Sequence, residues 1–141
     1  MGKKILVLGT GAQGSTVAQR MDEEDNVDRL ICADTDHKAV DELVKILKKA
    51  EGAYVDANDT QSIIKAAEGV DLIVNALPIR FAPNVLDAAL AVNANYQDFA
   101  ATDVLDEWWP RCVEIMYDEY GKKFAERKRL AIIGTGSAPG M

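Results

Sequence analysis

Short apolar runs alternate with amphipathic stretches along the whole chain. The first run, KKILVLG at 3–9, is apolar after its two lysines and ends in glycine. An uninterrupted run of this kind is typical of a strand buried on both faces of a parallel sheet. The stretch at 37–49 instead places Val40, Leu43 and Leu47 on one stripe, which predicts an amphipathic helix.

The same alternation continues to the end of the chain. The expected strands span 3–9, 28–34, 52–57, 71–78, 94–99 and 129–134. The expected helices span 12–21, 37–49, 59–69 and 83–93, followed by a long helix that begins near Pro110. Strands and helices in turn indicate right-handed βαβ units. The pattern therefore predicts an α/β fold, with a doubly wound parallel sheet in a three-layer α/β/α arrangement.

Composition limits the classes of partner. The 141 residues suit one domain, and their net charge of −7 disfavours nucleic acid and anionic membrane surfaces, which attract positive charge. No apolar stretch approaches the ~18 residues of a membrane span. The two cysteines, Cys32 and Cys112, match neither a disulfide framework nor a zinc site. We expect a cytoplasmic protein without a metal centre.

A glycine-rich turn follows the first expected strand directly. Residues 9–14 read GTGAQG and fit G-x-G-x-x-G between a strand and a helix, the context in which this motif seats a pyrophosphate. Gly9 would permit the tight turn, Gly11 the approach of the phosphates, and Gly14 close packing of the helix on the sheet. Backbone N–H groups and the helix dipole would then bind the phosphates. The expected phosphate-binding residues are Gly9, Thr10, Gly11, Ala12, Gln13 and Gly14.

An acidic residue ends the second expected strand. Asp34 lies twenty residues after Gly14, the spacing at which an acid binds the adenine ribose in Rossmann-type folds. Its carboxylate would repel the 2′-phosphate of NADP, Asp36 adds a second negative charge, and Thr35 stands where an arginine would favour NADP. We therefore predict a dinucleotide cofactor, NAD in preference to NADP. A methyltransferase that binds S-adenosylmethionine also has an acid here, but it has no pyrophosphate to account for the glycines.

Three further strand ends lie at the same edge of the expected sheet. Ligands of such sheets bind beyond the carboxyl ends of the strands. Asp56 and Ala57 are therefore expected beside the adenine, and Asn75, Ala76, Leu77 and Pro78 beside the nicotinamide ribose. Tyr96 and Asp98, on the fifth strand, come next along the edge.

Several polar residues have two interpretations. Asp98, at the end of the fifth strand, either faces a ligand or anchors a loop. Arg80 either meets a phosphate or lies on the surface. His37, the single histidine, suits a solvated helix start better than a general base. No catalytic residue is assigned.

The segment before the long helix also has two interpretations. Trp108 and Trp109 fit either an oligomer contact or packing beneath that helix. Asp103, Asp106 and Glu107 resemble a metal cluster in composition alone, and favourable charge at a helix start explains them better.

Four stretches together resemble the N-terminal half of the saccharopine dehydrogenase family, which includes saccharopine reductases and lysine 6-dehydrogenases. The stretches are VLGTGAQGSTVAQ, VDANDTQSIIKAAEGVDLIVNALP, ANYQDFA and IIGTGSAPGM. The last matches a G-x-x-P-G segment that the family places after the sixth strand, where the chain enters a substrate domain. Residues 103–129 form a longer, tryptophan-bearing connection than simple members have.

The resemblance implies the cofactor domain of an NAD(P)-dependent oxidoreductase of amino-acid metabolism, which acts on the C–N bond of an amino acid. Residues 1–141 would form an NAD(P)-binding Rossmann domain whose substrate-binding and dimerising domain is absent. Such a piece would bind cofactor and turn over little; the full-length protein would take an amino-acid-like substrate, and a homodimer is allowed. The alternative is a stand-alone module that senses NAD(H) and regulates a partner.

Overall fold

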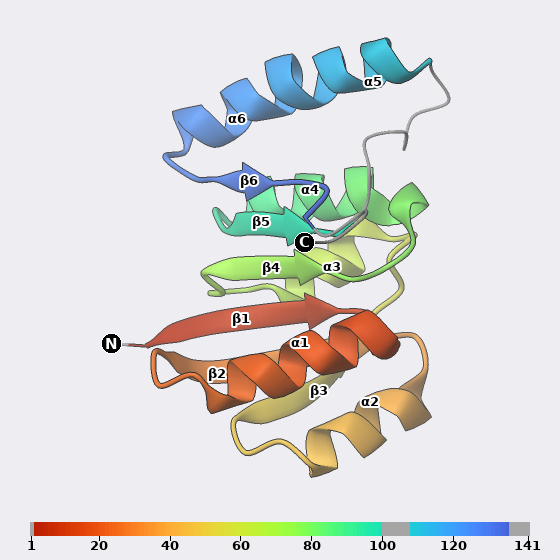
Figure 1. Ribbon diagram of the computed structural model, residues 1–141, viewed down its shortest axis with the longest axis vertical. Coiled ribbons are helices and arrows are strands. Elements are labelled where there is room, and N and C mark those ends of the chain that lie inside the picture. Colours follow the sequence, from red (N-terminus) through yellow and green to blue (C-terminus); the bar gives the residue numbers. More distant parts are fainter. Residues whose placement is uncertain (1, 100–107, 136–141) are drawn as a thin grey trace.

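One parallel sheet forms the centre of the molecule. The computed structural model describes residues 2–99 and 108–135. The strands lie in the order β3-β2-β1-β4-β5-β6 (Figure 1). They are β1 (Lys3–Leu8), β2 (Val27–Asp34), β3 (Ala50–Tyr54), β4 (Leu72–Asn75), β5 (Asn95–Asp98) and β6 (Ala131–Ile132), and all adjacent pairs are parallel. The order reverses between β1 and β4, which makes the edge above them the expected place for a ligand.

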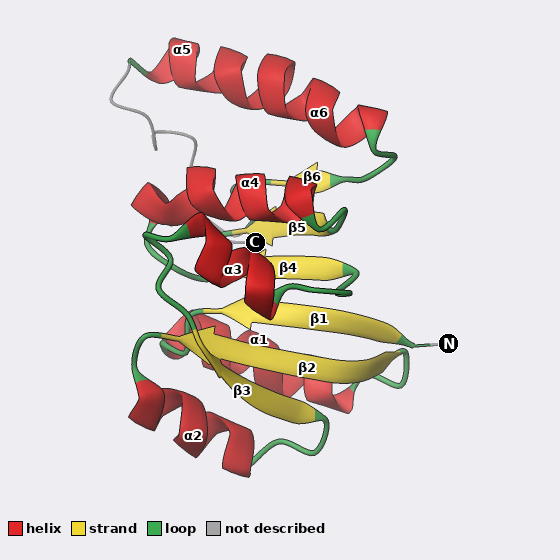
Figure 2. Ribbon diagram, turned by 180° about the vertical axis from the view of Figure 1, so that it is seen from behind, coloured by secondary structure: helices red, strands yellow, loops and turns green. Residues whose placement is uncertain are grey.

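Helices cover both faces of this sheet. They are α1 (Ala12–Glu23), α2 (His37–Lys45), α3 (Thr60–Ala66), α4 (Ala82–Ala91), α5 (Trp109–Glu114) and α6 (Gly121–Glu126), with a 3₁₀ turn η1 (Ile79–Phe81) and a π-helical segment η2 (Ile115–Tyr120). α1 and α2 lie on the face seen in Figure 1, and α3 and α4 on the face seen in Figure 2. The predicted doubly wound α/β/α fold is confirmed.

The apolar runs of the strands form two core clusters, one on each face. On β1, Ile5 and Val7 belong to the cluster with α1 and α2, whereas Leu6 and Leu8 belong to the cluster with α3 and α4. Both sets are buried because successive side chains of a strand point to opposite faces. This explains why the first run has no alternation of apolar and polar residues.

The second helix is shorter than the amphipathic pattern predicts. It begins as expected, because the Asp36 side chain accepts a hydrogen bond from the backbone N–H of Ala39 at 3.0 Å. It ends at Lys45 rather than at residue 49. The buried carboxylate of Asp22, on α1, accepts the backbone N–H groups of Lys48 at 3.0 Å and Lys49 at 2.8 Å. These bonds hold the chain in a turn that leads into β3.

Asp22 should make the stability of the fold depend on pH. Burial raises the pKa of its carboxyl, but the hydrogen bonds from the backbone of Lys48 and Lys49 outweigh burial and leave the pKa below 3.8. A carboxyl whose pKa is lower in the folded than in the unfolded protein stabilises the fold when the pH is above its unfolded-state pKa. This stabilisation is lost as the pH falls through the folded-state pKa.

We expect Asp22→Asn to lower the free energy of unfolding by about 1 kcal/mol at pH 7, the usual loss for hydrogen bonds to a buried group. The difference from the unmodified protein should shrink below pH 3.8. Urea unfolding at several pH values measures both effects. Glu23→Gln, on the exposed side of the same helix, is the control. A difference in the free energy of unfolding that does not change with pH would show that the charge of Asp22 does not stabilise the fold.

The third strand begins two residues earlier than predicted. It pairs with β2 from Leu30 opposite Ala50 to Asp34 opposite Tyr54. The Val55 N–H still donates to the Asp34 carbonyl at 3.1 Å, but β2 ends at Asp34, and residues 55–57 leave the sheet as a loop.

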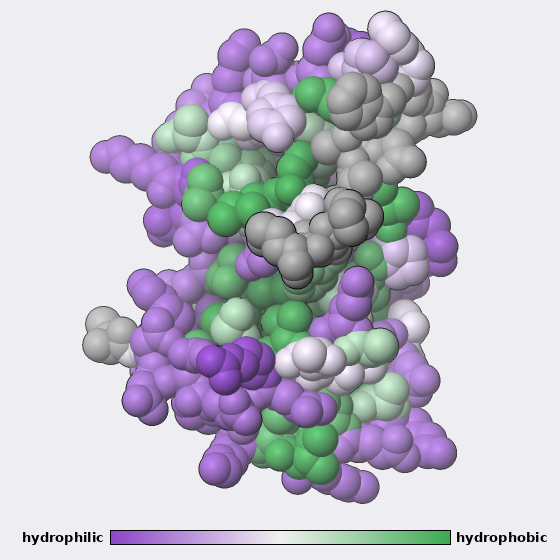
Figure 3. Space-filling model, viewed as in Figure 1, coloured by the Kyte–Doolittle hydropathy of each residue, from purple (hydrophilic) through white to green (hydrophobic). Residues whose placement is uncertain are grey.

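The predicted long helix is present and carries a π-helical segment in its middle. Its buried side chains include Cys112, Met116 and Phe124, whereas Tyr117 is 66% exposed. Tyr117 lies about a quarter turn beyond Met116, which takes the buried position. Figure 3 shows hydrophobic residues between α1 and this helix, over β6, where Leu130 and Ile132 are exposed.

Some predictions concern residues outside the described ranges. These are the acidic residues Asp103, Asp106 and Glu107, and the G-x-x-P-G segment at 136–140. Trp108 is described and 71% exposed. Over residues 2–99 and 108–135, no helix is long and apolar enough to cross a membrane, and no three potential metal ligands gather.

Candidate functional site

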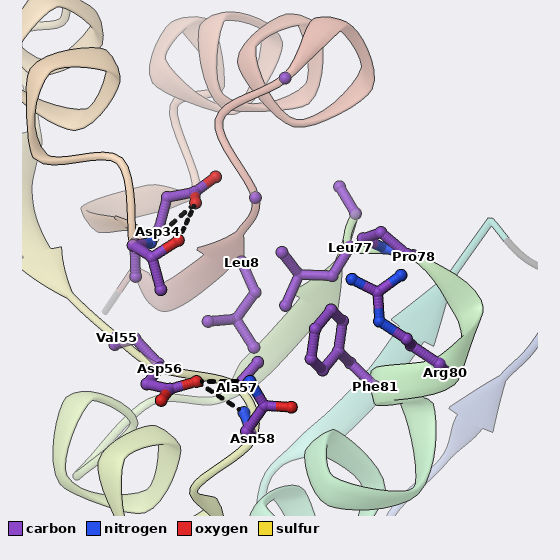
Figure 4. Close-up of a pocket in the computed structure, with 15 residues that line it drawn as sticks. Leu8, Asp34, Val55, Asp56, Ala57, Asn58, Leu77, Pro78, Arg80 and Phe81 are labelled. Carbon is purple, nitrogen blue, oxygen red and sulfur yellow. Dashed lines mark hydrogen bonds between the residues drawn. The ribbon is translucent and has the colours of Figure 1, made fainter.

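A cavity of about 480 Å³ opens at the carboxyl ends of β1, β2, β3 and β4. Figure 4 shows its walls, which come from loops far apart in the sequence. Nine predicted site residues line it: Gly9, Gly11, Asp34, Thr35, Asp56, Ala57, Ala76, Leu77 and Pro78. The lining also includes Leu8, Ala33, Val55, Asn58, Arg80 and Phe81. Thr10, Ala12, Gln13 and Gly14 belong to the same turn but do not line the cavity.

Two glycines of this turn are required by the fold. Gly9 has φ of +97°, and a Cβ there would lie 2.9 Å from the backbone oxygen of Ala76. A Cβ on Gly14 would lie 1.8 Å from the backbone oxygen of Gly9. The Gly9 N–H also donates to the Ala33 carbonyl at 2.8 Å. The turn is therefore fixed between the ends of β2 and β4, and α1 starts in close contact with it.

Gly11 is different, because the fold does not require a glycine there. Its φ of −70° and ψ of −166° are open to any residue. Apart from the two neighbours of Gly11 in the chain, no atom of the described residues lies within 4 Å of the position that a Cβ would take. Gly11 is also the N-cap of α1, and no side chain caps the helix. The first N–H groups of a helix have no partner within it, so the missing side chain leaves space for an anion in front of them.

Asp34 ties the glycine-rich turn to the end of β2. One carboxylate oxygen accepts the Thr10 N–H at 2.8 Å and the Thr10 hydroxyl at 3.0 Å. The other accepts the N–H groups of Thr35 at 2.7 Å and Asp36 at 3.3 Å. Burial raises the pKa of Asp34, but the hydrogen bonds from Thr10, Asp36 and Thr35 outweigh it and lower the pKa. The carboxylate is therefore charged at neutral pH, and Thr10 positions it from outside the cavity.

The loop after β3 forms another part of the cavity wall and carries a second carboxylate. Asp56 is exposed, and one of its oxygens accepts the backbone N–H of Asn58 at 2.9 Å and its side-chain amide at 3.0 Å. Asn84, on α4, donates to the Ala57 carbonyl at 2.9 Å. Between the two acidic loops, the buried residues Leu8 and Val55 give the cavity an apolar floor (Figure 4).

The turn after β4 supplies the remaining wall. The Asn75 side chain accepts the backbone N–H of Leu77 at 3.1 Å, which ends the strand earlier than the predicted residue 78. The Pro78 carbonyl then accepts the Phe81 N–H at 3.1 Å. The Arg80 guanidinium lies 4.5 Å from the centre of the Phe81 ring, and both side chains border the cavity (Figure 4).

Behind this wall, a chain of buried hydrogen bonds connects three strand ends. Asn75 donates to the Tyr96 hydroxyl at 3.1 Å, and that hydroxyl donates to Asp98 at 2.6 Å. The second oxygen of Asp98 accepts the Gly134 N–H at 2.8 Å. Burial, followed by the charge of Asp98, raises the pKa of Tyr96 well above its usual range. The structure thus favours the anchoring role of Asp98, which holds the loop after β6 and does not line the cavity.

The site residues that sequence reasoning missed are mostly apolar. In the sequence, Leu8, Ala33 and Val55 look like ordinary core residues. The one signal that they also line a cavity is their position at the carboxyl ends of the strands. His37 does not line the cavity; its ring stacks on Tyr54 at 3.8 Å. His37 therefore lies outside the cavity, which favours the helix start over the general base.

The cavity combines features that suit an adenine nucleotide with a diphosphate. Among the described residues, it has an apolar floor, bare backbone N–H groups at a helix start, two acids and one arginine. Ligand sites of this size are usually apolar clefts with a few placed polar groups.

Comparisons with known proteins identify the family of the chain. A family model described as the saccharopine dehydrogenase NADP binding domain matches residues 5–131. The chain is similar to saccharopine dehydrogenase (L-Glu forming) from Saccharomyces cerevisiae, with a TM-score of 0.78 and 19% identity over 99% of this chain and 28% of that one. It is also similar to Citrobacter sp. triphenylmethane reductase complexed with NADP(H), with a TM-score of 0.64 and 17% identity over 91% of this chain and 48% of that one.

A third similar structure is an NAD binding oxidoreductase from Klebsiella pneumoniae, with a TM-score of 0.66 and 17% identity over 94% of this chain and 34% of that one. At such identities these structures show the fold alone. The chain spans less than half the length of each of the three. The family match covers most of the chain and confirms the resemblance seen in the four stretches of sequence.

Proposed function

Because the chain belongs to the saccharopine dehydrogenase NADP binding domain family, we propose that it binds a nicotinamide dinucleotide in the cavity above β1 to β4. The observation that carries this proposal is Gly11, whose missing side chain the fold does not need. A diphosphate in front of α1 explains why the position is empty, since any side chain would occupy the same volume.

The other site residues are assigned by their place around that diphosphate. We assign the turn at 9–14 to the phosphates and the Asp34 carboxylate to the adenine ribose. Asp56 and Ala57, with Leu8 and Val55 beneath them, would enclose the adenine. The remaining predicted contacts, at the nicotinamide ribose, are Ala76, Leu77 and Pro78.

The choice between NAD and NADP depends on Asp34. Its lowered pKa keeps a negative charge at the ribose position, and like charges brought together cost several kcal/mol. This supports NAD. The comparisons do not support that preference, because the family is described as NADP-binding, while the similar structures name NADP(H) in one case and NAD in another. We retain NAD as our proposal because the argument from Asp34 concerns this chain's own residues.

Calorimetric titration with NAD⁺, NADH, NADP⁺ and NADPH tests both parts of the proposal. We expect dissociation constants between about 1 µM and 1 mM, with the NAD forms about tenfold tighter, since tenfold corresponds to 1.4 kcal/mol. Asp34→Ser should reduce or reverse the preference. Tighter binding of the NADP forms by the unmodified protein would overturn the assignment of Asp34, and failure to bind any of the four would overturn the proposed function.

We further propose that the chain is the cofactor-binding part of an oxidoreductase acting on the C–N bond of an amino acid. A bound nicotinamide would accept or supply the hydride. Substrate recognition would come from additional sequence, because the chain spans 28% of the yeast saccharopine dehydrogenase chain. We expect the present residues to bind the cofactor with little turnover of any amino acid, and a homodimer and a cytoplasmic location remain part of this proposal.

A further inference from the structure

The proposed ligand raises a problem of charge, because the cavity is lined by two acids and the chain carries a net charge of −7. A dinucleotide brings two negative charges on its diphosphate alone. The N-terminus of α1 supplies the equivalent of only about half a positive charge. Arg80 is the one cationic side chain in the lining of the cavity, among the residues that the structure describes.

Arg80 also differs from the other arginines of the chain. Arg20, Arg29 and Arg111 form ion pairs with glutamates. Arg127 and Arg129 donate to backbone carbonyls. Within the described ranges, the Arg80 guanidinium has neither a hydrogen bond nor an ion pair, and it lies over the Phe81 ring. Its five N–H donors are therefore open to a ligand.

The backbone beneath Arg80 is held in place. Asn75 fixes the turn through the Leu77 N–H, and the Pro78 carbonyl accepts the Phe81 N–H. The Phe81 ring supports the guanidinium from one side, with the Arg80 Cζ over the ring at 4.5 Å from its centre, and the Arg80 side chain is otherwise exposed. A supported guanidinium loses less conformational entropy when it binds an anion than a free side chain would.

The position of Arg80 indicates which phosphate groups of the ligand it would bind. Figure 4 shows its guanidinium beside Leu77 and Pro78, on the wall opposite Asp34. A 2′-phosphate would sit on the ribose beside Asp34, whereas the diphosphate would lie between that ribose and the turn after β4. Resting on the proposed function, we propose that Arg80 binds the dinucleotide diphosphate from the side opposite α1, so that the phosphates lie between backbone N–H groups and a guanidinium.

Binding of adenosine and ADP to Arg80→Gln tests this assignment, with NAD⁺ and NADP⁺ as the full ligands. We expect about tenfold weaker binding of ADP, NAD⁺ and NADP⁺, the usual loss for a hydrogen bond to a charged group at a partly open site. Adenosine, which has no phosphate, should bind unchanged. Arg80→Lys should recover part of the loss, because a lysine keeps the charge but not the planar fork.

Arg20→Gln is the matched control, since it makes the same change in net charge on an exposed part of α1. It should leave all four affinities within twofold. Unchanged binding of ADP by Arg80→Gln, or a loss confined to NADP⁺, would overturn the assignment to the diphosphate. If the unmodified protein binds none of these ligands, the proposed function itself is wrong. The two failures are therefore distinguishable.

Discussion

Replacing Gly11 with valine is expected to weaken dinucleotide binding at least 100-fold and to leave the fold intact. The backbone angles at Gly11 suit valine, and beyond the neighbours in the chain its Cβ would meet no atom of the described residues within 4 Å. The added methyl groups would occupy the space in front of the first N–H groups of α1, where the diphosphate is proposed to lie. Titration with NADH and thermal unfolding of the same sample measure the two parts of the prediction.

Gly121→Val gives a matched control for this experiment. A Cβ at Gly121 also meets nothing within 4 Å, but the residue lies on α6 and does not line the cavity. It should bind NADH normally. Normal binding by Gly11→Val would show that the ligand does not approach this turn, and a large loss of stability in that variant would show that the fold does constrain Gly11.

Replacing Asp98 with alanine is expected to have the largest effect on stability, lowering the free energy of unfolding by about 3 kcal/mol. Asp98 is 2% exposed and accepts hydrogen bonds from the Tyr96 hydroxyl and the Gly134 N–H. Its removal would leave the buried Tyr96 hydroxyl and the half-buried Gly134 N–H without these acceptors, and each unsatisfied buried donor costs about 1–3 kcal/mol. Denaturant unfolding measures the loss.

Asp87→Ala is the control for Asp98, because Asp87 also accepts a tyrosine hydroxyl, that of Tyr120, at 3.1 Å but is exposed. We expect a loss below about 1 kcal/mol there. Tyr96→Phe should fall between the two, since it removes one hydroxyl and keeps the Gly134 contact. Equal losses for Asp98→Ala and Asp87→Ala would contradict the anchoring role.

The glycine-rich turn and its acid could be predicted from the sequence because their properties are local. Position 9 needs a glycine because φ is positive there, and position 14 needs one because a Cβ would collide with the backbone oxygen of Gly9. Both follow the end of the short strand β1. Spacing alone then brings Asp34 to the same edge, where it binds Thr10. The sequence did not reveal that Thr10 would position Asp34 from outside the cavity.

The features that could not be predicted depend on contacts between distant residues. α2 ends early because of Asp22, a residue on another helix. The sequence allowed two interpretations of Asp98. The anchoring role depends on a hydrogen bond from Gly134, which lies next to Asp98 only because β5 pairs with β6. Arg80 likewise had two readings, since whether an arginine finds a partner is decided by the packing around it. Periodicity and motif spacing contain no information on such contacts.

The central claim is that the turn at 9–14 binds the diphosphate of a dinucleotide. A crystal structure of the protein soaked with NADH tests it most directly. The account predicts phosphate oxygens within hydrogen-bond distance of the N–H groups at the start of α1, in the space beside Gly11, with a ribose hydroxyl at Asp34. A dinucleotide bound elsewhere, with the space in front of α1 empty, would contradict it.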